Sequence, residues 1–235
     1  YYYCDKHGML VMQDMVNNGD YNFIMDTALP TVGIKKYLNR RKRITQVQKE
    51  IFEKHMLETL EYLYNHPCIV AYTIFNEGWG QFDADRMYGV AKKADSSRLY
   101  DATSGWFAEK DSDFDSMHIY FGTKKPVQKV RPVLLSEFGG YSYLVEDHVF
   151  SSKTYGYGTC RSEEELWERI HKRYTELVIP YVYLESGLCG SIFTQLSDVE
   201  DEINGLYTYD RKVCKVDKEK MKHMAEALFR WQLRR

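Results

Sequence analysis

Apolar positions along the chain follow two patterns, short and nearly continuous apolar runs and longer stretches with helical spacing. The short runs predict β-strands at residues 8–14, 69–76, 98–103, 117–121, 132–137 and 188–195. Most of these runs lack strict alternation, so both faces of each strand are expected to be covered, as in a parallel sheet flanked by helices. The pattern therefore predicts an α/β fold.

The longest stretch with helical spacing predicts a helix that begins after Thr45. Thr45 and Gln48 form a capping-box pair, and His66-Pro67 is expected to stop the helix. The apolar stripe expected to face the core is Val47, Ile51, Met56, Leu60, Leu63 and Tyr64.

Three more amphipathic stretches predict helices that begin after Asp83, Ser162 and Asp217. Ser162 pairs with Glu165 in a second capping box, and Pro180 is expected to kink or end that helix. The expected stripes are Met87, Val90, Ala91 and Ala94, then Leu166, Ile170, Tyr174, Leu177 and Val178, then Met221, Met224, Leu228 and Trp231.

Alternation of strands and helices favours a parallel sheet in a single domain over residues 1–235. The composition is that of a globular protein, with 44% hydrophobic and 28% charged residues. A single α/β barrel, which typically has about 250 residues, is within range.

Charge and cysteine content exclude several function classes. Lys plus Arg total 32 and Asp plus Glu total 34, which gives no electrostatic case for nucleic acid or an anionic membrane. The basic run 40–43 is interpreted as a solvated segment. No apolar run has the length of a membrane span.

The five cysteines form no CxxC pair, which argues against zinc and disulfide frameworks and favours a cytoplasmic protein.

Polar residues gather where the predicted strands end. In a parallel barrel these ends share the face on which active sites form. The residues are Asp14, Asn76, Glu77, Thr103, His118, Tyr120, Glu137 and Gln195.

Two of these residues, Glu77 and Glu137, are carboxylates that follow strongly apolar runs. Two carboxyl groups at one barrel mouth suggest glycoside hydrolysis, with one as an acid of raised pKa and the other ionised. A separation of about 5–5.5 Å would let the second attack the sugar carbon directly. The alternative is that both form ordinary salt bridges with Arg or Lys.

Several segments in order resemble glycoside hydrolase family 2, which holds β-galactosidases, β-glucuronidases and β-mannosidases. Residues 76–80, Asn-Glu-Gly-Trp-Gly, resemble its acid/base segment, and residues 136–140, Ser-Glu-Phe-Gly-Gly, its nucleophile segment. Residues 4–14 resemble the third barrel strand and its approach, and residues 65–69 the corner before the fourth. Residues 194–211 are similar to the end of the catalytic domain. The resemblance implies a (β/α)8 TIM barrel.

The resemblance also implies roles for individual residues. Glu77 would be the general acid and then the base, and Glu137 the nucleophile that forms a covalent glycosyl-enzyme. Asn76 would bind the sugar 2-hydroxyl, and Tyr120 would orient the nucleophile. The remaining substrate-binding candidates are Trp79, Trp106, His118, Asp14 and Gln195, where Trp106 could instead pack in the core and His118 could be a core histidine.

The chain departs from the family pattern at its start. It opens at the approach to the third strand, so strands 3 to 8 of an incomplete barrel are expected. We interpret it as the C-terminal part of a catalytic domain in a longer chain, whose expected partners are upstream β-sandwich domains or a second copy. An open barrel exposes strand edges, so the isolated 235-residue chain is expected to be poorly stable and to have little activity.

The sugar is less readable than the reaction. The family's β-glucuronidases carry an Asn-x-Lys pair after the last strand, whereas Asn204-Gly205-Leu206 stands here, which favours a neutral sugar such as galactose. The acidic group 198–202 lacks EF-hand spacing and is expected to be a solvated loop. No cofactor or metal is expected. The alternatives to a retaining β-glycosidase of β-galactosidase type are a β-glucuronidase or β-mannosidase specificity and a non-catalytic carbohydrate-binding or scaffold domain.

Overall fold

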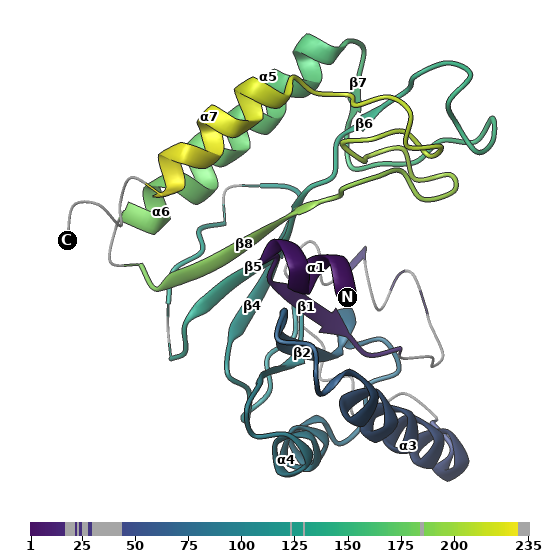
Figure 1. Ribbon diagram of the computed structural model, residues 1–235, viewed down its shortest axis with the longest axis vertical. Helices are drawn as coiled ribbons and strands as arrows, with labels where there is room; N and C mark the ends of the chain where they lie inside the picture. The colour runs from purple at the N-terminus through teal and green to yellow at the C-terminus, as the bar shows by residue number, and fades with distance from the viewer. Residues whose placement is uncertain are drawn as a thin grey trace. The chain divides into compact units, whose positions relative to one another are not determined.

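The computed structural model describes residues 1–16, 22, 24, 28–29, 44–122, 124–128, 130–183 and 186–229. The chain divides into two compact units, Tyr1–Ser116 and Met117–Arg235, which are described separately (Figure 1). The basic run 40–43 and Trp231 lie outside the described residues. The single domain expected from the sequence stays a prediction.

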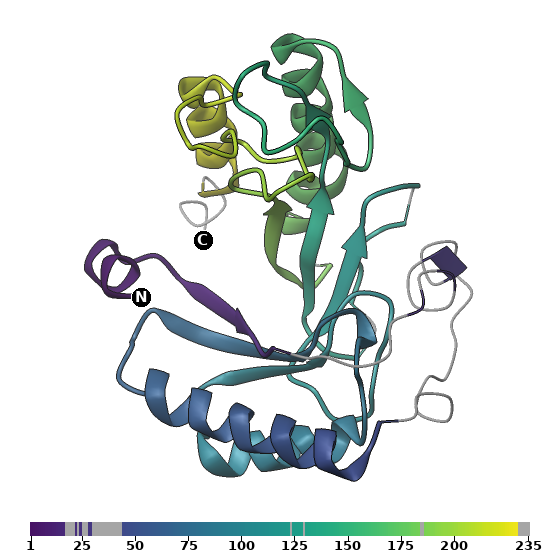
Figure 2. The ribbon, with the colours of Figure 1, turned by 90° about the vertical axis from the view of Figure 1, so that its right-hand side faces the viewer.

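The first unit is a three-stranded parallel sheet with α3 (Gln46–Leu63) and α4 (Ala84–Ala94) on one face (Figure 2). The strand order is β1-β2-β3, in the order of the sequence, and Tyr72 of β2 pairs with Tyr100 of β3. The elements are α1 (Tyr2–His7), β1 (Val11–Asp14), α3 (Gln46–Leu63), β2 (Ile69–Phe75), the single 3-10 turn η3 (Asn76–Gly78), α4 (Ala84–Ala94) and β3 (Leu99–Thr103).

Helix α3 confirms its predicted start and the C-terminal half of its predicted stripe, Met56, Leu60 and Leu63. The Thr45 side chain accepts the Gln48 N–H, and the Gln48 side chain accepts the Thr45 N–H, which completes the capping box. The buried residues are Phe52, Met56, Leu60 and Leu63. Val47, Ile51 and Tyr64, predicted for the stripe, are exposed. A step of four residues from Phe52 to Met56 to Leu60 follows one helix face, and Val47 and Ile51 lie beside that face.

The predicted cap of α4 is wrong in its mechanism. Asp83 stands at the N-cap position but makes no side-chain cap hydrogen bond. Its carboxylate pairs with Lys49 of α3 at 3.2 Å instead. Within the predicted stripe, Met87 and Ala91 are buried while Ala94 is exposed.

The second unit contains a sheet in the order β4-β5-β8, in which β5 and β8 are parallel. Its helices and sheet share two apolar clusters, one with Ile119, Leu135 and Phe138, the other with Leu166 and Met224. The elements are β4 (Asp115–Ile119), which begins in the last residues of the first unit, β5 (Val133–Gly139), β6 (Ser142–Tyr143), β7 (Thr159–Cys160), α5 (Glu163–Arg173), η4 (Tyr174–Val178), α6 (Ile179–Tyr183), β8 (Leu188–Thr194) and α7 (Lys218–Phe229).

Pro180 does not end the helical segment, so of the two predicted outcomes, a kink or an end, the end is wrong. The chain passes from α5 through the π turn η4 into α6, which carries Pro180 as its second residue. Proline removes one N–H and its ring crowds the carbonyl four residues earlier. The wider π turn directly before it changes the position of those carbonyls, which explains how the helix continues.

Two helix starts in this unit confirm the predicted caps. The Ser162 side chain accepts the Glu165 N–H at 3.2 Å, although the Glu165 carboxylate binds the Arg161 N–H rather than closing a capping box. Asp217 accepts two N–H groups at the start of α7. None of the helices in the described part of the chain has the length and apolarity to cross a bilayer.

The acidic segment 198–202 is not the fully solvated loop that was expected. Asp198 is 1% exposed and pairs with the equally buried Lys215 at 2.7 Å. The Lys215 ammonium also donates to the carbonyls of Tyr143 and Ile203, and Asp198 accepts the Gly205 N–H. Burial raises the pKa of Asp198 and lowers that of Lys215, because each charge loses water, and their mutual contact opposes both shifts.

Breaking this pair on one side should be costly. Lys215→Met is expected to lower the free energy of unfolding by about 3–5 kcal/mol, since it leaves a buried carboxylate without its counter-charge. Asp198→Asn in the same chain should restore part of that loss because no net charge then remains buried. Denaturant unfolding measures the free energy of unfolding of the single and the double variant, with Lys212→Met, at an exposed lysine, as control. A Lys215→Met loss no larger than that of the control would contradict the role of the pair.

Candidate functional site

The turn after β2 carries the first candidate carboxylate in a strained backbone. Glu77 has a φ of 50° and is 6% exposed, and Gly78 follows with a φ of 66°. A Cβ at Gly78 would lie 2.9 Å from the Phe107 ring, so only glycine fits there. A positive φ at a non-glycine residue costs free energy, and such strain is concentrated at functional positions.

A serine that directly follows β3 holds this turn. The Ser104 hydroxyl accepts the Glu77 N–H at 3.2 Å and donates to Asn76 Oδ1 at 2.5 Å. On the main chain, the Ser104 N–H donates to the Phe75 carbonyl at 3.0 Å, and the Trp79 N–H donates to the Asn76 carbonyl at 2.9 Å. Sequence reasoning missed Ser104, although its place directly after a strand end was a usable signal.

The aromatic candidates of the first unit differ in exposure. Trp106 is 8% exposed, which favours the packing alternative for its ring, whereas Trp79 is half-buried. The Gln81 amide nearby donates to Glu109, and burial raises the pKa of that carboxyl. Asp14 ends β1 with an exposed side chain. Sugar-stacking and hydroxyl-binding roles for these residues stay predictions.

The second candidate carboxylate, Glu137, lies on β5 with two of the predicted residues beside it. The Tyr120 hydroxyl donates to Glu137 Oε2, and His118 Nδ1 lies 3.4 Å from the same oxygen. Burial, followed by the Glu137 charge, raises the pKa of Tyr120 far above its ordinary value. Tyr120 therefore stays protonated and acts towards Glu137 as a donor, which stabilises an ionised carboxylate.

A tyrosine that sequence reasoning missed fixes the Tyr120 ring. Tyr157 stacks on Tyr120 with ring centroids 3.6 Å apart, and its N–H donates to the Gly140 carbonyl at 2.8 Å. Gly140 has a φ of 71°, and a Cβ there would lie 2.5 Å from the Tyr157 ring. Tyr157 stands in a loop without strand or helix spacing, so no sequence pattern pointed to it.

Gln195 follows β8, as expected, but its amide is occupied within the protein. Its nitrogen donates to Asn204 Oδ1 at 2.6 Å and to Glu202 at 3.2 Å. Asn204 is buried at 1% exposure, and a Cβ on Gly205 would lie 2.2 Å from the Ser197 carbonyl carbon. These contacts describe a structural corner after β8, and a direct contact of Gln195 with sugar stays a prediction.

The structure thus brings the predicted residues together in two groups. Asn76 and Glu77 share one turn in the first unit, and Glu137, Tyr120 and His118 share one cluster in the second. The approach of the two carboxyl groups to about 5–5.5 Å stays a prediction.

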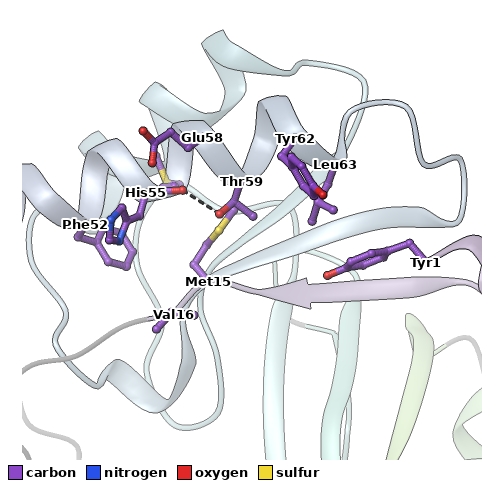
Figure 3. Close-up of a pocket in the computed structure, with 10 residues that line it drawn as sticks. Tyr1, Met15, Val16, Phe52, His55, Glu58, Thr59, Tyr62 and Leu63 are labelled. Carbon is purple, nitrogen blue, oxygen red and sulfur yellow. Dashed lines mark hydrogen bonds between the residues drawn. The ribbon is translucent and has the colours of Figure 1, made fainter.

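The first unit also contains an open groove. It lies between α3 and the N-terminal segment (Figure 3). Residues that line it include Tyr1, Met15, Phe52, Thr59 and Tyr62, and the Thr59 hydroxyl donates to the His55 carbonyl at 2.8 Å. None of the predicted site residues lines this groove.

Comparison with known proteins identifies a family and a fold. The profile of the family described as "Glycosyl hydrolases family 2, TIM barrel domain" matches residues 1–143, more than half of the 235-residue chain. The sequence has no match among the curated proteins.

Solved structures with a similar fold include three enzymes from bacteria. A β-D-glucuronidase from Dictyoglomus thermophilum has a TM-score of 0.60 and 14% identity, and the match covers 98% of this chain and 42% of that one. A β-galacturonidase from Eisenbergiella tayi has a TM-score of 0.59 and 15% identity, and the match covers 97% of this chain and 42% of that one. A β-glucuronidase from Bacteroides uniformis has a TM-score of 0.57 and 16% identity, and the match covers 98% of this chain and 29% of that one. This chain therefore spans less than half the length of each. At these identities the likeness shows the fold.

Proposed function

Since this chain belongs to the glycosyl hydrolases of family 2 as part of their TIM-barrel domain, we propose that it carries the two catalytic carboxylates of a retaining β-glycosidase. The observation that carries the proposal is the Glu137 carboxylate, which accepts the hydroxyl of a tyrosine that stays protonated. A hydrogen bond donated to a carboxylate favours its ionised form and orients it, as a nucleophile requires. Tyr120 and His118 are among the partners of Glu137.

The proposed reaction is a double displacement. Glu137 attacks the anomeric carbon of a β-glycoside while Glu77 gives its proton to the departing oxygen, so the glycosidic bond breaks and an α-linked glycosyl ester forms. Glu77, now a carboxylate, takes a proton from water, which attacks the same carbon and releases Glu137. Configuration at the anomeric carbon is retained, and the reaction needs no metal ion or cofactor.

The second part of the proposal is that Asn76 contributes to transition-state binding. Asn76 would bind the sugar 2-hydroxyl, a contact that strengthens in the transition state. Because binding that is stronger in the transition state than in the ground state raises kcat, the loss of this contact should lower kcat more than it changes KM.

The substrate class within this reaction is proposed from one corner of the chain. Asn204 is occupied by Gln195 and Glu202, and Gly205 has no room for a side chain. Leu206 stands where the family's β-glucuronidases carry the lysine of their Asn-x-Lys pair, so no cation is offered here to a sugar carboxylate. The absence of that lysine favours a neutral sugar such as galactose. The similar structures are named for uronic acid glycosides, so a panel of aryl β-galactoside, β-glucuronide and β-mannoside is the direct comparison.

Trapping the intermediate tests the proposed function. A 2-deoxy-2-fluoro β-glycoside with a good leaving group should form a stable ester on Glu137, because the fluorine slows both displacements while the good leaving group speeds only the first. Intact-mass spectrometry should show the gain of one fluorosugar, and peptide mapping should place it within residues 133–139. A non-catalytic carbohydrate-binding domain would gain no mass with any sugar of the panel.

A further inference from the structure

Ser104 occupies a buried position between the two residues of the proposed acid/base segment. Its side chain is 2% exposed, and its hydroxyl lies 2.5 Å from Asn76 Oδ1 and 3.2 Å from the Glu77 nitrogen. The backbone N–H of Ser104 is itself held by the Phe75 carbonyl at 3.0 Å. The serine is therefore anchored to the end of β2 by its main chain and to the following turn by its side chain.

The hydrogen-bond roles of this serine follow from its burial. A hydroxyl has one proton and two lone pairs, and the Glu77 N–H can only donate to it. A buried hydroxyl proton needs an acceptor, and the Asn76 amide oxygen is the acceptor within reach. With its oxygen turned to Ser104, the Asn76 amide presents its NH2 group at the opposite end.

We propose that Ser104 is a positioning residue that makes Asn76 a hydrogen-bond donor to substrate and fixes the backbone of the turn that carries Glu77. The inference rests on the proposed function. Asn76 would donate to the oxygen of a sugar hydroxyl, which leaves that hydroxyl's own proton for a second acceptor. Without the serine, the Asn76 amide can rotate and present its oxygen, and the positive φ of Glu77 loses a contact that holds it.

The test combines Ser104→Ala with Asn76→Ala and with a 2-deoxy substrate, in the intact protein. Ser104→Ala is expected to lower kcat/KM on the parent aryl glycoside by about 10–100-fold. In the Asn76→Ala background, or with the 2-deoxy glycoside as substrate, Ser104→Ala should lower kcat/KM less than about threefold, because the oriented contact is already gone. If Ser104 were merely structural, Ser104→Ala would lower kcat/KM by the same factor in every background and on both substrates.

Ser116→Ala is the matched control. Ser116 is a buried serine of the same unit whose hydroxyl donates to the Thr103 carbonyl at 3.3 Å. It is expected to change kcat/KM equally little on both substrates. If Ser104→Ala fails to fold, Ser104→Cys, which keeps the volume but is a weak donor, is used in the same cycle.

Hydrogen exchange gives a readout that does not depend on turnover. Exchange of the Glu77 amide should be faster in Ser104→Ala than in the wild type and unchanged in Ser116→Ala. Unchanged Glu77 exchange, or equal factors on parent and 2-deoxy substrates, overturns the role of Ser104. If the wild type hydrolyses no glycoside of the panel, the proposed function fails, whereas the exchange result still reports on the turn.

Discussion

Glu137→Ala is expected to lower kcat by on the order of 10⁴–10⁶-fold on every substrate that the wild type hydrolyses. Removal of a covalent nucleophile leaves only the contribution of binding and of the remaining groups. The size of the effect should not depend on the leaving group, because the carboxylate is needed however well the aglycone departs. Steady-state kinetics with a series of aryl glycosides measures this.

Azide should rescue Glu137→Ala with a change of stereochemistry. The small anion can enter from the side that the carboxylate vacates and attack the anomeric carbon, so a β-glycoside should give an α-glycosyl azide. Glu146→Ala, which removes an exposed carboxylate from the same unit, is the control and should leave kcat unchanged. Wild-type turnover by Glu137→Ala, or its labelling by the fluorosugar, would show that the nucleophile lies elsewhere.

Glu77→Gln is expected to lower kcat about 10²–10⁴-fold for glycosides with poor leaving groups, which need protonation to depart. The amide keeps the shape of the side chain but cannot release a proton to the aglycone. For a dinitrophenyl glycoside the first displacement should be nearly unaffected, while the second slows because water loses its base. The glycosyl-enzyme should then accumulate and give a burst of phenolate.

This dependence on the leaving group separates an acid/base from a residue that only supports the fold. Glu61→Gln on the exposed face of α3 is the matched control and should leave kcat unchanged for glycosides with good and with poor leaving groups. A Glu77→Gln loss of equal size across the leaving-group series would contradict the acid role. Proton NMR of the first product gives the anomeric configuration. An inverted product would indicate carboxyl groups about 6.5–9.5 Å apart instead of about 5–5.5 Å.

The order of the main strands could be predicted from the sequence alone, and the sequence also offered two carboxylates as candidates. Six predicted strands match β1, β2, β3, β4, β5 and β8, because apolar runs of this length have few alternatives in a globular chain. Glu77 and Glu137 were proposed as candidates from the apolar runs that precede them, and the caps at Thr45 and Asp217 were predicted from local hydrogen-bonding chemistry. All of these signals act over a few neighbouring residues.

What the sequence left undetermined involves partners far apart in the chain. The tertiary structure decided that α3 buries Phe52 rather than Val47, because the face that meets the sheet depends on where the strands lie. It also decided that Asp198 is buried, since the lysine that pairs with it comes 17 residues later. Ser104 binds the turn at Glu77 across 27 positions for the same reason. Such contacts depend on the geometry of the folded sheet, which no local pattern of residues encodes.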